Sequence, residues 1–128
     1  MTMFSHIMLG ADDVQVAKKF YDAVLGTLGY KPGAIDDKGR CFWMDKAGIF
    51  SVTPPIDGKP ASCGNGSTVG FAVDSKEKAD AWHKAGLENG GTAIEDPPGE
   101  RGGPLGKLYL AYLRDPSGNK ICALHRMG

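Results

Sequence analysis

The sequence has no excess of charge of either sign, because 15 Lys and Arg residues balance 15 Asp and Glu residues. Nucleic-acid binding normally leaves a basic footprint on a domain, so this balance argues against a nucleic-acid partner. The sequence also lacks any apolar run near the ~18 residues that a membrane span requires, and its start, MTMFSHIMLG, lacks the basic segment of a signal peptide. We therefore expect no membrane partner and no secretion signal.

Cysteine is scarce and follows no metal-binding or redox motif. Cys41, Cys63 and Cys122 cannot all pair with one another, and no CxxC motif occurs. Reduced thiols and a cytoplasmic location are the simplest interpretation. The abundant residues are instead 19 Gly and 8 Pro, which cluster in turns and favour many short strands over a helical bundle.

The sequence resembles itself when it is shifted by 62 positions. Asp12 to Gln15 then falls on Asp74 to Glu77, and both segments have the pattern of a helix capping box. A single match would be chance, but this many at one offset indicate a duplicated unit. The other matches are Ile7 with Val69, Leu9 with Phe71, Ala17 with Ala79, Phe20 with Trp82, Leu25 with Leu87 and Gly29 with Gly91.

Each unit predicts one strand, one helix and three further strands, from alternating or helical spacing of apolar residues. The first unit predicts strands at 4–10, 30–35, 40–45 and 48–53 and a helix at about 13–28. The second predicts strands at 67–73, 92–96, 107–114 and 119–125 and a helix at 75–89. We expect a single domain over 1–128, with one module at about 1–57, a linker at about 54–66 and a second module at about 64–128.

The segments HIMLGADDVQVAKKFYDAVLGTLGY and YLAYLRDPSGNKI resemble the glyoxalase / bleomycin-resistance / extradiol-dioxygenase superfamily, also called vicinal oxygen chelate proteins. The resemblance covers essentially the whole chain. It implies an α+β fold in which two tandem βαβββ modules set curved mixed sheets around a cavity, with the helices outside. It also implies that a divalent metal is common in the cavity, although one fold carries many chemistries.

Strand alternation predicts which side chains face the cavity. Bulky apolar residues such as Ile7 suit the helix-covered face, so their small or polar neighbours would face inward. Tyr and Trp side chains on strands are compatible either with a pocket for a flat ligand or with the hydrophobic core. The predicted cavity-lining residues are His6, Met8, Trp43, Thr68, Tyr109, Tyr112, Cys122 and Leu124.

The resemblance assigns metal ligands to a His on the first strand of each unit and a Glu on the last strand. These positions fall on His6, Thr68 and Cys122, so one ordinary ligand type remains. Oxygenase iron needs two His and a carboxylate, and catalytic zinc needs about three protein ligands. We therefore expect no tightly bound cofactor. A divalent metal at His6, with Cys122 as a second ligand, is the alternative to an interior His and a buried thiol.

The segment from Asp96 to Lys107 has no counterpart in the first unit. It is either a lid over the cavity or a hairpin connection of no consequence. Glu100 is its candidate catalytic base, because no other carboxylate maps near the cavity.

Together these features predict a glyoxalase- or bleomycin-resistance-like protein that binds a small molecule in the cavity between its modules, with a degenerate metal site. The alternative is a metal-dependent lyase or isomerase of glyoxalase type that uses His6, rather than an extradiol dioxygenase. Whether the protein is an enzyme is left open. Exposed sheet edges and the resemblance both favour a homodimer.

Overall fold

The computed structural model describes residues 3–104 and 106–128, and its first half forms a four-stranded sheet with one helix. The strand order is β1-β4-β3-β2, with β1 parallel to β4 and the other pairs antiparallel. The elements are β1 (His6–Gly10), α1 (Val14–Gly26), β2 (Ala34–Ile35), β3 (Cys41–Asp45) and β4 (Gly48–Thr53).

The second half repeats this arrangement with one addition. Its first strand again pairs in parallel with its last, in the order β5-β9-β8-β6, and β7 pairs with β8. Both helices have 13 residues, and they begin 62 positions apart, as the repeat predicts. The predicted α+β fold of two duplicated units is confirmed. The elements are β5 (Val69–Ala72), α2 (Lys76–Glu88), β6 (Thr92–Ala93), β7 (Gly99–Gly103), β8 (Gly106–Arg114) and β9 (Lys120–Arg126).

Strand β7 is absent from the sequence-based prediction, which treated its residues as a loop. In the structure it pairs in antiparallel register with β8, so that Glu100 lies opposite Tyr109. The short strand β6 pairs only with Leu113 and Arg114, which leaves the rest of that edge of β8 without a partner strand. Strand β7 satisfies those backbone groups, as an exposed sheet edge requires.

Each helix begins one residue later than the capping-box pattern predicts. Asp13 caps α1, because its Oδ1 accepts hydrogen bonds from the backbone N–H groups of Gln15 and Val16. Ser75 caps α2 through a hydrogen bond from the backbone N–H of Lys78. Both side chains satisfy helix N–H groups that have no partner within the helix.

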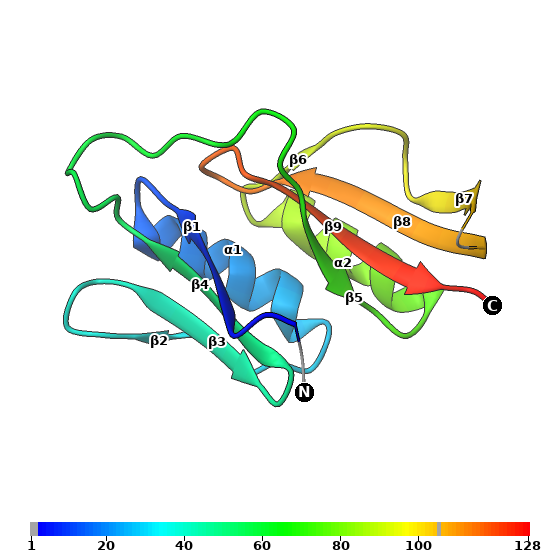
Figure 1. The fold of residues 1–128 in the computed structure, drawn as a ribbon, viewed down its shortest axis with the longest axis horizontal. Helices are drawn as coiled ribbons and strands as arrows, with labels where there is room; N and C mark the ends of the chain where they lie inside the picture. The colour runs from blue at the N-terminus through cyan, green and yellow to red at the C-terminus, as the bar shows by residue number, and fades with distance from the viewer. Residues whose placement is uncertain (1–2, 105) are drawn as a thin grey trace.

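Both helices lie behind the two sheets in Figure 1, so each sheet has one face against a helix and one face that no helix or strand of the described residues covers. Alternation predicted these faces. On β1, Ile7 and Leu9 are partly buried, whereas His6 and Met8 on the other face are exposed. On β9, Ile121 and Ala123 are fully buried, Cys122 on the other face is 5% exposed and Leu124 is partly buried. None of the helices formed by the described residues is long and apolar enough to cross a membrane.

An aromatic chain connects the two halves of the core. Phe50 on β4 lies 4.7 Å from Tyr21 on α1 and 5.1 Å from Phe71 on β5, measured between ring centroids. Phe71 in turn lies 6.4 Å from Trp82 on α2. Such ring pairs contribute beyond the area that they bury, so they help to hold the two sheets side by side.

A buried carboxylate makes a second connection. Asp115, in the turn between β8 and β9, accepts a 2.6 Å hydrogen bond from the Tyr21 hydroxyl on α1. It also accepts hydrogen bonds from the backbone N–H groups of Ser117 and Asn119 and from the Asn119 side chain. Asn119 Nδ2 donates as well to the carbonyl oxygen of Gly10, at the end of β1. One turn of the second half is therefore fixed to two elements of the first.

Candidate functional site

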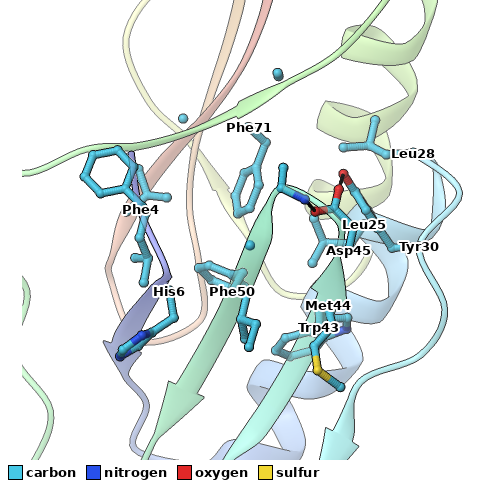
Figure 2. A pocket seen from close by; sticks show the side chains of 17 residues that line it. Phe4, His6, Leu25, Leu28, Tyr30, Trp43, Met44, Asp45, Phe50 and Phe71 are labelled. Atoms are coloured by element: carbon cyan, nitrogen blue, oxygen red, sulfur yellow. Dashed lines mark hydrogen bonds between the residues drawn. The ribbon is translucent and has the colours of Figure 1, made fainter. Parts of the chain in front are cut away.

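A pocket lies between the two sheets, where the C-terminal end of α1, the β3–β4 hairpin and β5 meet (Figure 2). We call it the aromatic pocket, and its volume is about 250 Å³. The lining residues are Phe4, His6, Ile7, Leu25, Leu28, Tyr30, Trp43, Met44, Asp45, Ala47, Gly48, Ile49, Phe50, Val69, Gly70, Phe71 and Ala72.

Aromatic and aliphatic side chains form most of this lining. Trp43 and Phe50 are register partners on β3 and β4, and their ring centroids are 5.8 Å apart. Phe71 extends the row from β5. The indole N–H of Trp43 donates to Asp22 Oδ1 at 3.0 Å, which fixes the orientation of the ring. A lining of this kind favours an apolar or flat ligand.

The polar groups of the aromatic pocket lie on two sides of it. The Tyr30 hydroxyl donates to Asp45 Oδ2 at 2.7 Å, and the Ala47 backbone N–H donates to Asp45 Oδ1 at 2.6 Å. These hydrogen bonds lower the pKa of Asp45, and the bond to Asp45 raises the pKa of Tyr30. His6 lies opposite, with its Nδ1 2.8 Å from Ser5 Oγ.

A smaller, more polar pocket of about 210 Å³ lies under the segment between β4 and β5. Met8 on β1, Cys63 and Thr68 on the connecting segment, and Asn119 and Lys120 at the start of β9 contribute to it. Lys120 forms an ion pair with Glu95, and its Nζ lies 5.0 Å from the ring centroid of Tyr112.

The structure distributes the predicted cavity residues among several places. His6 and Trp43 line the aromatic pocket, whereas Met8 and Thr68 line the smaller one. Cys122 and its register partner Tyr112 lie on the uncovered face of the second sheet and line neither of these two pockets. Leu124 lies on that face too, in register with Ala72.

Tyr109 lies on the opposite, helix-covered side of its strand. Its hydroxyl donates to Asp80 Oδ1 on α2 at 2.7 Å, and this bond raises the pKa of Tyr109 to about 12. Glu100 is the register partner of Tyr109, is exposed and lines neither pocket. The structure therefore places the candidate base on the β7–β8 hairpin, away from the aromatic pocket.

The residues present do not fit a conventional metal site. Within residues 3–104 and 106–128, no three His, Cys, Asp or Glu side chains form a group that could hold a metal ion. His6 and Thr68, which the resemblance assigns as ligands, line different pockets. Burial raises the pKa of the Cys122 thiol to about 11, and Cys122 lines neither pocket, so it does not lie in the aromatic pocket with His6.

The sequence analysis predicted only His6 and Trp43 among the residues that line the aromatic pocket, and it missed Phe4, Tyr30, Asp45 and Phe71 among others. No sequence motif marks Asp45 or Tyr30, and they meet only because the β3–β4 hairpin reaches the end of α1. Phe71 is a bulky apolar strand residue of the kind that alternation assigns to the helix-covered face, and it lines the pocket because β5 is an edge strand of its sheet.

Duplicated β-α-β units with two uncovered sheet faces define a class of ligand-binding and catalytic folds, and the sequence identifies which one. A family model of the Glyoxalase/Bleomycin resistance protein/Dioxygenase superfamily matches residues 3–123, so the chain belongs to this superfamily. The chain is similar to a glyoxalase/bleomycin resistance protein from Albidiferax ferrireducens T118, with 62% identity and a TM-score of 0.95 over 98% of this chain and 100% of that one.

More distant structures share the fold alone. A putative glyoxalase from Bacillus halodurans has 21% identity and a TM-score of 0.75, over 96% of this chain and 95% of that one. Lactoylglutathione lyase from Agrobacterium tumefaciens has 20% identity and a TM-score of 0.67, over 98% of this chain and 94% of that one.

Proposed function

We propose that this protein binds a small, largely apolar molecule in the aromatic pocket between its two modules. The observation that carries the proposal is the pocket itself, with about 250 Å³ lined by side chains from both halves of the chain. Trp43, Phe50 and Phe71 supply the flat apolar surface, and Asp45, Tyr30 and His6 supply the few polar groups that orient a ligand. Ligand sites typically combine these two features.

The same proposal includes a degenerate metal site. A lone imidazole holds a divalent ion weakly, because catalytic zinc takes about three protein ligands. His6 has Ser5 as its hydrogen-bond neighbour, and Cys122 does not line the aromatic pocket with it. Elemental analysis of the dialysed protein tests this point. Stoichiometric Zn, Ni, Mn or Fe that is lost in His6→Ala would contradict it and would favour a metal-dependent lyase or isomerase.

We also propose that the protein is a cytoplasmic homodimer. Each sheet has edge strands, β1 and β2 in the first and β5 and β6 in the second, and exposed edges favour pairing with another chain. Met8 and Met44 add exposed apolar surface on the uncovered face of the first sheet. The three cysteines are free thiols, as a reducing compartment requires.

Filling the pocket tests the binding proposal. Ala72 lines the aromatic pocket and is exposed, so Ala72→Phe fills pocket volume without disturbing the core. Ala34→Phe is the matched control, because Ala34 is also an exposed strand alanine and lines neither pocket. Binding of indole, a flat neutral probe, is measured by calorimetry.

We expect Ala72→Phe to weaken indole binding at least fivefold and Ala34→Phe to leave it unchanged. Equal binding by a folded Ala72→Phe variant would place the ligand elsewhere. Absence of indole binding to the unchanged protein would contradict the proposal itself.

A further inference from the structure

The charges around the aromatic pocket are unbalanced. Asp45 is the one acidic side chain among the described residues that line it, and none of those residues is Lys or Arg. Lys46 follows Asp45 in the hairpin turn but does not line the pocket. The four ion pairs found among the described residues all involve other carboxylates.

The Asp45 carboxylate is held in place without being neutralised. One oxygen accepts from the Tyr30 hydroxyl at 2.7 Å, and the other accepts from the Ala47 backbone N–H at 2.6 Å. Both donors are uncharged, and they lower the pKa of Asp45, so the group carries a full negative charge at neutral pH. A fixed, unpaired carboxylate at the edge of an apolar pocket attracts a cation.

The lining reinforces this preference. Trp43, Phe50 and Phe71 form a continuous row of rings, with centroids 5.8 and 5.1 Å apart. Aromatic faces attract cations through their quadrupole, and aromatic-lined sites recurrently bind quaternary ammonium groups. Figure 2 shows Asp45 beside Tyr30 and Leu25 on one side of the pocket, with Phe4 and His6 on the other.

We infer that the aromatic pocket selects an organic cation, a molecule with an apolar aromatic body and an amine or quaternary ammonium group directed toward Asp45. This inference rests on the proposed function, because it specifies the ligand class of the same pocket. It predicts discrimination by charge among ligands of similar size and shape.

Three benzyl-type probes test it: benzyltrimethylammonium as the cation, benzyl alcohol as the neutral molecule and phenylacetate as the anion. Each is titrated by calorimetry into the unchanged protein, Asp45→Asn and Asp37→Asn. In Asp45→Asn the amide oxygen still accepts from the Ala47 N–H, and the Tyr30 hydroxyl can accept from the amide NH2, so the variant removes the charge and keeps a side chain of the same shape. Asp37 is an exposed carboxylate outside both pockets, which makes Asp37→Asn the control for a change in net charge.

We expect the cation to bind about fivefold to tenfold more tightly than the neutral probe and the anion to bind most weakly. Asp45→Asn should remove this advantage and leave the neutral probe unaffected, whereas Asp37→Asn should change neither. Equal binding of the three probes, or the same loss in Asp37→Asn, would overturn the charge selection while leaving the pocket as a binding site. Absence of binding by all three would overturn the proposed function and this inference with it.

Discussion

The hydrogen bond from Tyr21 to Asp115 should be a large stabilising contact between the two modules. Tyr21 is fully buried, and Asp115 is 4% exposed. Replacing Tyr21 by Phe keeps the ring against Phe20, Trp43 and Phe50 and removes only the hydroxyl. The buried carboxylate then loses one donor that water cannot easily replace.

A hydrogen bond to a buried charged group contributes about 1.5–3 kcal/mol. For a domain of this length that loss corresponds to a decrease in Tm of roughly 6–12 °C. Urea unfolding followed by tryptophan fluorescence measures the free energy of unfolding directly, because Trp43 and Trp82 are both buried in the core.

Tyr30→Phe is the matched control. The Tyr30 hydroxyl donates to Asp45 at 2.7 Å, close to the 2.6 Å of the bond from Tyr21 to Asp115, but Asp45 is exposed. Water replaces a lost hydrogen bond there, so we expect a cost below about 1 kcal/mol. If Tyr21→Phe costs no more than Tyr30→Phe, burial of the carboxylate is not what makes the contact strong.

Three further outcomes are expected. Burial and the Asp115 charge raise the pKa of Tyr21 well above its usual range, so the folded state holds this proton more tightly than the unfolded state. The contribution of Tyr21 to the free energy of unfolding should therefore be constant below about pH 10 and should fall as the pH rises further. Urea titrations above pH 10 should show a shallower loss of stability in Tyr21→Phe, and equal slopes would contradict this. A thiol reagent should modify the exposed Cys63 rapidly and the buried Cys41 and Cys122 slowly, since burial raises the pKa of both buried thiols. Mass spectrometry of the modified peptides gives the order of labelling, and fast labelling of Cys122 would refute this prediction. Light scattering at micromolar concentration should give twice the chain mass, and a mass near 13.5 kDa would refute the homodimer.

The fold was predictable because its signals are local and repeated. Capping residues, helical spacing and strand alternation each appear twice at the same offset, so each repeat supports the secondary structure predicted for the other. The helices match the predicted ranges closely, and burial alternates from His6 to Leu9 along β1. Strand β7 was not predictable in this way, because its glycine-rich sequence has no apolar alternation and it pairs only to cover the edge of β8.

The site was less predictable, because a pocket depends on how elements meet. Asp45 ends β3 and Tyr30 follows α1, and the two are joined by a 2.7 Å hydrogen bond that no local pattern indicates. Phe71 faces the helix layer, as alternation predicts, and still lines the pocket because β5 has no further strand beside it.

Strand alternation alone predicts that the two tyrosines of β8 face opposite sides of the sheet. Tyr109 and Tyr112 are separated by an odd number of positions, so side chains on a regular strand must point to opposite faces. Grouping both as cavity residues was inconsistent with the period of a strand. The structure places Tyr112 with Cys122 on the uncovered face and Tyr109 against Asp80 of the helix layer. His6 lines the aromatic pocket, Thr68 lines the smaller pocket and Cys122 lines neither, so these three residues do not share one pocket among the described residues.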